Sequence, residues 1–333
     1  MRPVVSTVIP VRNGAATIAA AVDSALFQKF DRPFEVIVVN DGSTDDTRQV
    51  LARYLGRIKL IDLRGRGTAA ARNAGIFAAE SEFVAFLDAD DAWLPHKLAR
   101  MIQTLETAAD CVLAYSDLIA VDANGRELSS SFITARHAYA PSLDNLLSEW
   151  WQIFPSATIV RRSTLARIGG FCERFGTGYG SEDAHCWILA RECGPFRYVA
   201  EPLTRYRMPD IGERLRKRAQ MLASRREPLE YVANDLYLYR FLRDRYGAAA
   251  NEICVQLRRG AAGTLLTLGL TAINLGDAAF ARRCYLASLR LWPVQLKTVA
   301  RLGAAMLPPA AARSLSAKLP PRYSRGLFGP SQA

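Results

Sequence analysis

Short apolar runs alternate with polar, alanine-rich segments along the first part of the chain. Each run has five or six residues and is rich in Val, Ile or Phe, which is typical of buried strands. We expect strands over 4–9, 34–39, 58–63 and 83–87. The segments between the runs have the composition of helices. Strands that alternate with helices predict a mostly parallel sheet with right-handed crossovers, so the expected fold class is α/β.

The middle of the chain has a weaker pattern. Residues 111–122 predict one or two strands, and the sequence Asp-Ala-Asn-Gly at 122–125 predicts a hairpin turn. Residues 126–141 show no period, which fits either a loop that shapes a substrate entrance or a disordered connector. The runs 196–199 and 202–207 predict closing strands.

The last third has a helical pattern from Gly212 to about Pro308. Ten of its positions fit the spacing of a tetratricopeptide-like helix pair, whose repeat is about 34 residues long. These positions are Leu265, Leu268, Gly269, Ala272, Gly276, Asp277, Ala281, Tyr285, Ser288 and Pro293. A solenoid normally needs three or more repeats and one is visible here, so a plain helical hairpin is the favoured interpretation. From Pro320 onward we expect a frayed tail.

Length and composition indicate two domains. The chain has 333 residues, and we place one domain at 1–210 and a basic helical domain at 211–333. No stretch reaches the ~18 uninterrupted apolar residues of a membrane span. The N-terminus leads into a strand without a signal-peptide pattern, and the six cysteines form no Cys-x-x-Cys pair. Reduced thiols in a cytoplasmic protein are therefore expected.

The charge is uneven along the chain. Residues 1–207 carry 23 Lys and Arg against 24 Asp and Glu, whereas residues 208–333 carry 20 against 8. A solvated basic surface is the simplest interpretation, and we do not expect nucleic acid as a partner. Basic residues also interleave with leucines over 282–302, and such helices can lie on an anionic membrane surface. Peripheral attachment to the inner face of the cell membrane is thus an open alternative.

Three aspartates follow the fourth predicted strand. Asp88, Asp90 and Asp91 lie where ligands bind in open α/β sheets, beyond the carboxyl end of a strand. Carboxylates this close repel one another, and a divalent cation such as Mg²⁺ or Mn²⁺ relieves the repulsion while taking further ligands from phosphate oxygens. The alternative is an acidic turn that caps a helix beginning near Pro95.

A second acidic loop, at Asp41, follows the second strand and so reaches the same edge of the sheet, which favours a nucleotide site. A competing pattern is Gly65-x-Gly67-x-x-Ala70, which imitates the dinucleotide-binding fingerprint of an oxidoreductase. That fingerprint usually marks the first βα unit, and this pattern is in the third. The fingerprint also includes a later acid that binds the ribose, for which Asp88 is the candidate. Such an acid needs no neighbouring aspartates, so we rank this alternative lower.

Four short motifs occur in order over about ninety residues. They are Val8-Ile-Pro-Val-Arg-Asn13-Gly14, Val39-Asn-Asp41-Gly-Ser-Thr-Asp45, Ala71-Arg72-Asn73-Ala-Gly75 and Leu87-Asp88-Ala89-Asp90-Asp91. Together they resemble a family 2 glycosyltransferase with the GT-A fold. The resemblance implies a nucleotide-diphosphate sugar as donor, with a UDP-sugar favoured.

The resemblance also implies roles for individual residues. Asp88-Ala89-Asp90 matches the Asp-x-Asp motif, with Asp90 as the main ligand of Mg²⁺ or Mn²⁺ and Asp88 as the second. The positions that would contact the nucleotide are Pro10, Val11, Asn13, Asp41, Arg72, Asp88 and Ala89.

A glycine-containing run over 169–180 leads to Ser181-Glu182-Asp183, and Ser181 is a good N-cap. Acids stabilise helix N-termini, which is a complete structural explanation for both carboxylates. The segment also resembles the Glu-Asp motif of the same family. That likeness makes Asp183 the general base and gives Glu182 an orienting or acceptor-binding role. The glycines before the motif suit a mobile loop over the donor at 172–181. We expect His185 on the helix surface.

The closing strand ends in Tyr206-Arg207, as in many relatives, but no histidine follows it here. The function that the resemblance implies is sugar transfer to an acceptor hydroxyl, with inversion. The acceptor would be a carbohydrate or lipid-linked molecule in bacterial-type surface polysaccharide or glycolipid synthesis. Two alternatives stay open, a nucleotide-binding oxidoreductase and a non-enzymatic module that binds a partner through its basic helices.

Overall fold

The computed structural model describes residues 2–134, 137–175, 181–210, 212, 227–293 and 296–306. Within these residues the chain forms two compact units. The first unit takes most of residues 1–208. The second takes the described residues from 209 onward together with 147–150.

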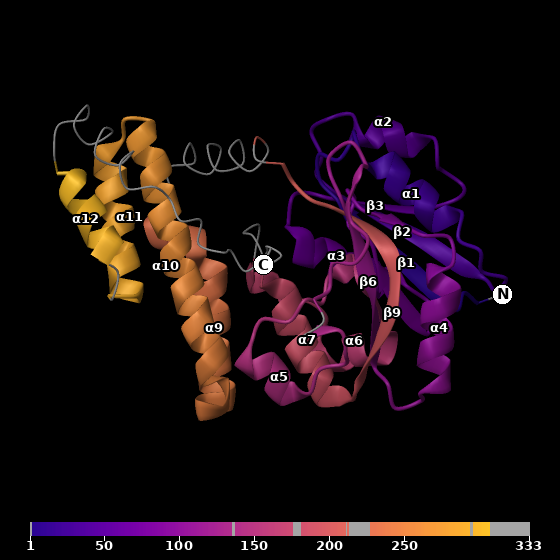
Figure 1. Ribbon diagram of the computed structural model, residues 1–333. Coiled ribbons are helices and arrows are strands. Elements are labelled where there is room, and N and C mark those ends of the chain that lie inside the picture. Colours follow the sequence, from indigo (N-terminus) through magenta and orange to yellow (C-terminus); the bar gives the residue numbers. More distant parts are fainter. Residues whose placement is uncertain are drawn as a thin grey trace. The chain divides into compact units, whose positions relative to one another are not determined.

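The first unit is built on a nine-stranded sheet (Figure 1). Its strands are β1 (Val5–Val11), β2 (Phe34–Asp41), β3 (Lys59–Leu63), β4 (Phe83–Phe86), β5 (Ala92–Trp93), β6 (Leu113–Val121), β7 (Glu127–Ser129), β8 (Thr158–Arg161) and β9 (Phe196–Arg207). Their order is β3-β2-β1-β4-β8-β6-β9-β5, with β7 paired to β6. The α/β class predicted from the alternating pattern is confirmed.

Parallel pairing is confirmed for the first four strands, in which β1 lies between β2 and β4 and β2 pairs with β3. Beyond β4 the sheet is mixed. Strand β8 runs antiparallel to both β4 and β6, while β6 and β9 are parallel. The predicted hairpin turn joins β6 to β7, and a turn this short requires an antiparallel pair. The two predicted closing strands form one strand, β9, with register shifts against β6.

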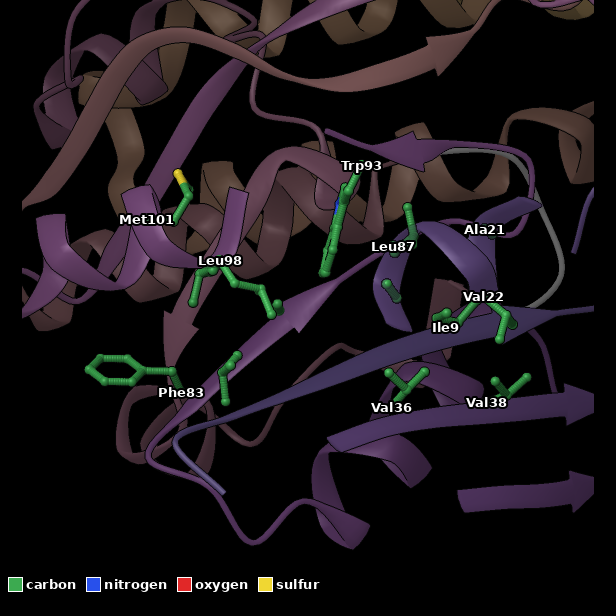
Figure 2. Packing of buried hydrophobic residues seen from close by; sticks show 14 of the residues in the cluster. Ile9, Ala21, Val22, Val36, Val38, Phe83, Leu87, Trp93, Leu98 and Met101 are labelled. Carbon is green, nitrogen blue, oxygen red and sulfur yellow. The ribbon is translucent and has the colours of Figure 1, made fainter. Parts of the chain in front are cut away.

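Helices connect these strands. They are α1 (Ile18–Leu26), α2 (Thr47–Ala52), α3 (Thr68–Ala78), α4 (Lys97–Thr107), α5 (Leu143–Ser148), α6 (Arg162–Ile168) and α7 (Glu182–Cys193), with 3₁₀ turns η2 (Pro155–Ala157) and η3 (Glu173–Phe175). Side chains of β1 and β2, including Ile9 and Val36, pack against Val22 of α1 in the main core (Figure 2). Helix α3 covers the opposite face, because its Gly75 rests on Val8, the neighbour of Ile9 along β1.

The second unit is helical. It contains η4 (Pro228–Val232), α9 (Ala233–Tyr246), η5 (Gly247–Ala250), α10 (Asn251–Asn274), α11 (Ala278–Leu291) and α12 (Leu296–Ala304). Asp277 caps α11, since its side chain accepts a hydrogen bond from the backbone of Phe280 at 2.8 Å. A Cβ at Gly269 of α10 would overlap Tyr285 of α11, so these two helices meet closely there.

The tetratricopeptide-like character of this hairpin stays a prediction, and the tail from Pro320 lies outside the described residues. Among the helices that the structure describes, none has the length and apolar character needed to span a membrane.

Candidate active site

The loops after β1 and β2 are tied together at the carboxyl edge of the sheet. Asn13 takes a left-handed conformation with φ of 55°, and its side chain accepts a hydrogen bond from the backbone of Thr44 at 2.8 Å. Its own backbone N–H donates to Ser43 Oγ at 2.9 Å. Ser43 and Thr44 do not cap the next helix, because α2 begins at Thr47, and their side chains secure the neighbouring loop instead.

Asp41 is buried at the end of β2 and holds the loop that leads into α3. Its carboxylate accepts hydrogen bonds from the backbone N–H groups of Arg66 and Gly67, both at 2.7 Å. A dinucleotide-binding fingerprint offers the amides at this helix start to a pyrophosphate. Here a carboxylate of the chain itself receives them. The geometry thus opposes the oxidoreductase alternative based on Gly65 to Ala70.

The three aspartates after β4 separate into two groups. The side chains of Asp88 and Asp90 are 31% and 47% exposed, whereas Asp91 is 3% exposed as a residue. Asp91 accepts a hydrogen bond from the backbone N–H of Arg207 at 2.8 Å. Burial, together with the charges of Asp90 and Asp88, raises the pKa of Asp91 well above its usual value. Asp91 therefore anchors the acidic loop to β9, while Asp88 and Asp90 face outward.

Lys97 is a member of this region that the sequence analysis missed. Its side chain is fully buried, and its Nζ donates hydrogen bonds to Thr204 Oγ1 at 3.1 Å and Ser116 Oγ at 3.4 Å. Burial lowers the pKa of Lys97 to about 7, although the charge of Asp91 opposes the shift. A sequence signal existed, since Lys97 lies four residues before Met101 and so falls on the apolar face of α4.

Arg72 of α3 joins two of the sequence motifs. Its Nη2 lies 2.8 Å from Asp88 Oδ1 and its Nη1 lies 2.9 Å from Glu182 Oε1. The guanidinium stands over the ring of Phe171 at 5.2 Å. Burial alone would lower the pKa of Arg72, but the two carboxylates outweigh it and raise that pKa. The acidic loop after β4 and the start of α7 therefore belong to one site.

Helix α7 begins with Glu182 and Asp183. Asp183 is partly exposed, and its Oδ1 accepts a hydrogen bond from the backbone N–H of Ala184 at 2.8 Å. Burial of the carboxyl, together with the charge of Glu182, raises the pKa of Asp183 to about 7. A carboxyl group with such a pKa can exchange protons near neutral pH, which a general base requires.

Two expectations for this helix are wrong. The side chain of Ser181 makes no capping hydrogen bond to α7, because its backbone takes a left-handed conformation with φ of 75°. His185 is buried against Phe175, with ring centroids 5.4 Å apart, and does not lie on the helix surface. Residues 176–180 of the predicted mobile loop lie outside the described residues.

Tyr206 and Arg207 bring the end of β9 to the same site. Arg207 Nη1 lies 3.9 Å from Asp90 Oδ2. Tyr206 packs on Phe154, with ring centroids 4.9 Å apart. Burial, together with the nearby aspartates, of which Asp91 acts most strongly, raises the pKa of Tyr206. The end of β9 thus places an arginine, Arg207, beside the main candidate metal ligand.

The carboxylates of the acidic loop suit a metal cation that takes part of its coordination from a substrate. No group of three or more His, Cys, Asp or Glu side chains arranged to hold a metal ion occurs in the described parts of the chain. Asp88 and Asp90, two residues apart on the acidic loop, nevertheless have partly exposed carboxylates. Mg²⁺ is usually bound through one or two carboxylates together with phosphate oxygens and water. The residues present fit that mode of binding.

Hydrogen bonds fasten the described residues of the middle of the chain to strand β6. Asp117 of β6 accepts hydrogen bonds from the backbone N–H groups of Phe132 and Ile133 at 3.1 and 2.9 Å. Trp151 is buried, and its indole donates to the hydroxyl of Tyr115 at 3.2 Å. Trp151 is accordingly a core residue and is not exposed for stacking on a sugar ring.

Comparison with known proteins agrees with this geometry. The model of the family described as glycosyl transferase family 2 matches residues 6–169, which hold the four motifs and most of the sheet. The α/β unit belongs to glycosyltransferase family 2. The oxidoreductase alternative is therefore dropped.

Two bacterial relatives match the same part of the chain. The succinoglycan biosynthesis protein ExoO of Rhizobium meliloti is 41% identical over 143 residues, which is 42% of this chain and 40% of that protein. An uncharacterized glycosyltransferase of Nostoc, alr2836, is 37% identical over 131 residues, or 38% of this chain and 40% of that one. The chain thus matches about two fifths of the length of these curated relatives.

Solved structures confirm the GT-A fold. Staphylococcus aureus TarS 1–349 in complex with UDP-GlcNAc has a TM-score of 0.59 at 19% identity, covering 96% of this chain and 91% of that one. The mannosyltransferase PcManGT of Pyrobaculum calidifontis, in complex with GDP-Man and Mn²⁺, has a TM-score of 0.53 at 20% identity, covering 96% and 85%. At this level of identity the likeness establishes the fold.

Proposed function

We propose that this glycosyltransferase transfers a hexosyl group, with inversion, from a nucleotide-diphosphate sugar to an acceptor hydroxyl. The observation that carries the proposal is the pair of ion contacts from Arg72 to Asp88 and to Glu182. These contacts join the acidic loop, which would face the donor diphosphate in this proposal, to the helix that bears Asp183. Sugar transfer needs both groups around one anomeric carbon.

The donor nucleotide lies along the loops after β1, β2 and β4 in this proposal. Pro10, Val11, Asn13, Asp41 and Ala89 are the contacting positions, and Asp88 completes them. The closeness of the three loops supports these positions. Asn13 contacts the loop after β2, and a Cβ on its neighbour Gly14 would lie 3.7 Å from the Cβ of Ala89. A UDP-sugar is favoured, and GDP is the main competitor because the structural neighbours were solved with UDP-GlcNAc and with GDP-Man.

Asp90 and Asp88 would hold Mg²⁺ or Mn²⁺. A divalent cation supplies neutralisation of the negative charge that develops on a departing diphosphate. Arg207, 3.9 Å from Asp90, adds a fixed positive charge on the same side. The acidic loop keeps its shape through Asp91, whose carboxylate is bonded to the backbone of β9.

Asp183 acts as the general base. It takes the proton of the acceptor hydroxyl while the acceptor oxygen bonds to the anomeric carbon from the face opposite the diphosphate. The bond between that carbon and the diphosphate oxygen breaks, and the nucleoside diphosphate leaves with the electron pair. Glu182 orients the helix start or contacts the acceptor.

The acceptor proposed is a carbohydrate or a lipid-linked carbohydrate in the synthesis of a surface polysaccharide or glycolipid. The likeness to a succinoglycan biosynthesis protein supports this class. Such work would place the enzyme in the cytoplasm, with anionic membrane as a candidate surface for exposed arginines such as Arg240, Arg259 and Arg290 of the helical unit.

Calorimetric titration of UDP, GDP and dTDP, with Mn²⁺ and then with a chelator, tests the donor site. We expect one nucleotide to bind in a metal-dependent manner, and Asp90→Asn to weaken that binding by more than the roughly 10–100-fold typical of changes around a metal's ligands. Asp110→Asn, an exposed substitution in the same unit, serves as the control. Equal binding with and without metal would contradict the assignment of Asp90.

A further inference from the structure

We propose that Arg72 is a positioning residue that fixes the start of α7, and with it the base Asp183, relative to the acidic loop at Asp88. This inference rests on the proposed function and assigns Arg72 a different task from the nucleotide contact that the family resemblance implies. The juxtaposition behind it is the bridge from one guanidinium to Asp88 and Glu182.

Arg72 contacts the acidic loop and helix α7 through two different nitrogens of its guanidinium. Nη2 of Arg72 contacts Asp88, and Nη1 contacts Glu182, at 2.8 and 2.9 Å. Only 4% of the Arg72 side chain and 14% of the Glu182 side chain are exposed. Ion pairs removed from water in this way are screened little by solvent or salt, so they hold geometry better than surface pairs do. A planar guanidinium is suited to two simultaneous contacts, whereas an ammonium is a single point of charge.

The beginning of α7 needs such a support. Ser181 precedes the helix in a left-handed conformation that is uncommon for residues other than glycine, and its side chain does not cap the helix. Glu182 is the first residue of α7 and the direct neighbour of Asp183. Fixing the Glu182 carboxylate therefore restricts where the carboxylate of Asp183 can lie.

The surroundings of Arg72 hold it in one orientation. Its guanidinium stands over Phe171 at 5.2 Å, and the loop that carries Phe171 is fastened to α3 by Asn73. The Asn73 amide donates to the carbonyl of Phe171 at 2.8 Å and accepts from the N–H of Phe171 at 2.8 Å. Arg72 thus connects the acidic loop to the base helix through one contact from each of its terminal nitrogens.

A double-mutant cycle on the full chain tests this role. The variants are Arg72→Lys, Glu182→Gln and the two combined, with Arg72→Met added because removal of the buried cation is the change most apt to disturb folding. The readouts are the affinity for the nucleotide selected by calorimetry, kcat and KM for release of that nucleotide from its sugar donor, and the thermal unfolding temperature.

We expect Arg72→Lys and Glu182→Gln to lower kcat by similar factors, on the order of 10²-fold for a misplaced catalytic group. Nucleotide affinity should stay unchanged. The kcat of the double variant should be little lower than that of either single variant, because each substitution already breaks the same bridge between Arg72 and Glu182.

Two results would overturn the proposal. The first is weaker nucleotide binding in Arg72→Lys with normal binding in Glu182→Gln, which would assign Arg72 to the donor base or ribose. The second is a double variant in which the two losses multiply, which would mean that the residues act separately. Failure of the proposed function itself looks different, because the wild-type protein would then bind no nucleotide.

Discussion

The two units of this protein bury charge in very different ways. In the α/β unit, Asp41, Arg72, Asp91 and Lys97 are each at most 3% exposed, and they lie around the loops at one edge of the sheet. Among the described residues from α9 to α12, one charged side chain, Arg301, is buried to the same degree. Both units have apolar cores of their own.

This difference in buried charge shows which part of the protein accepts a cost in folding free energy. Burying a charge costs free energy unless a partner compensates, so a stable fold has no need to gather buried charges in one place. Strongly shifted pKa values also concentrate at functional sites. Three of the shifted groups of the α/β unit, Asp91, Lys97 and Asp183, belong to the site around the acidic loop. The predictions below ask how far this contrast extends.

The largest effect should come from Asp183→Asn. Loss of a general base typically lowers the rate by ~10²–10⁴-fold, and nucleotide affinity should be spared. The folded state raises the pKa of this carboxyl to about 7, so its ionised form is costly to bury. The neutral amide should therefore unfold at a higher temperature than the wild type at pH 8.

Donor turnover and differential scanning calorimetry together measure this outcome, with Asp110→Asn as the exposed control. A variant that keeps near-normal turnover would remove Asp183 from the mechanism, whatever its stability.

A second effect is the pH profile of the wild type. A base must be ionised to accept a proton, so kcat/KM should rise through pH 7 and fall by about tenfold for each unit below it. The stability linkage has the opposite direction. Because the folded pKa of Asp183 lies above the ordinary value near 4, its contribution to stability is full below about pH 4 and is lost as the pH rises through 7.

Initial rates between pH 5 and 8.5 measure the profile. A limb centred near pH 4 would show that Asp183 ionises like an exposed aspartate and would contradict its buried environment.

The sequence predicted the scaffold, and it predicted that the acidic loops share one edge of the sheet, for identifiable reasons. The apolar runs at 4–9 and 34–39 have the period and length of buried strands, and the aspartates that end such strands necessarily reach one edge. The pairing order beyond β4 was not predictable, since β8 and β6 meet through contacts distant in sequence. The burial of Lys97 and the bridge from Arg72 depend on the same long-range packing, which no local pattern records.

Lys97 should produce a smaller effect, seen in stability rather than in chemistry. Its pKa in the folded state is lowered to about 7, while in the unfolded chain it is near 10.4. The unfolded state therefore binds more protons between these two pKa values. The free energy of unfolding should rise with pH in this range by at most about 1.4 kcal/mol per unit, and this contribution should be lost as the pH falls through 7. Lys97→Met should abolish this rise, whereas exposed Lys59→Met should keep it.

Chemical denaturation between pH 7 and about 8 measures the slope while most cysteines of the unfolded chain are still protonated. An unchanged slope in Lys97→Met would place the responsible proton on another group.

The smallest effect is expected in the helical unit. It tests whether charged side chains matter less there than in the α/β unit. Arg283 is half-exposed and pairs with Glu227 at 2.8 Å, and Arg290 is exposed on the same helix. Replacing both by Gln should change the free energy of unfolding by no more than about 0.5 kcal/mol for each, and leave turnover of a soluble nucleotide sugar unchanged, because surface ion pairs contribute little.

If these arginines instead serve an anionic membrane, cosedimentation with phosphatidylserine vesicles should weaken by about 1 kcal/mol for each residue removed. Retained vesicle binding would leave them as ordinary surface charges. Reduced turnover with a soluble donor would mean that the helical unit contributes to catalysis, and the contrast between the two units would no longer hold.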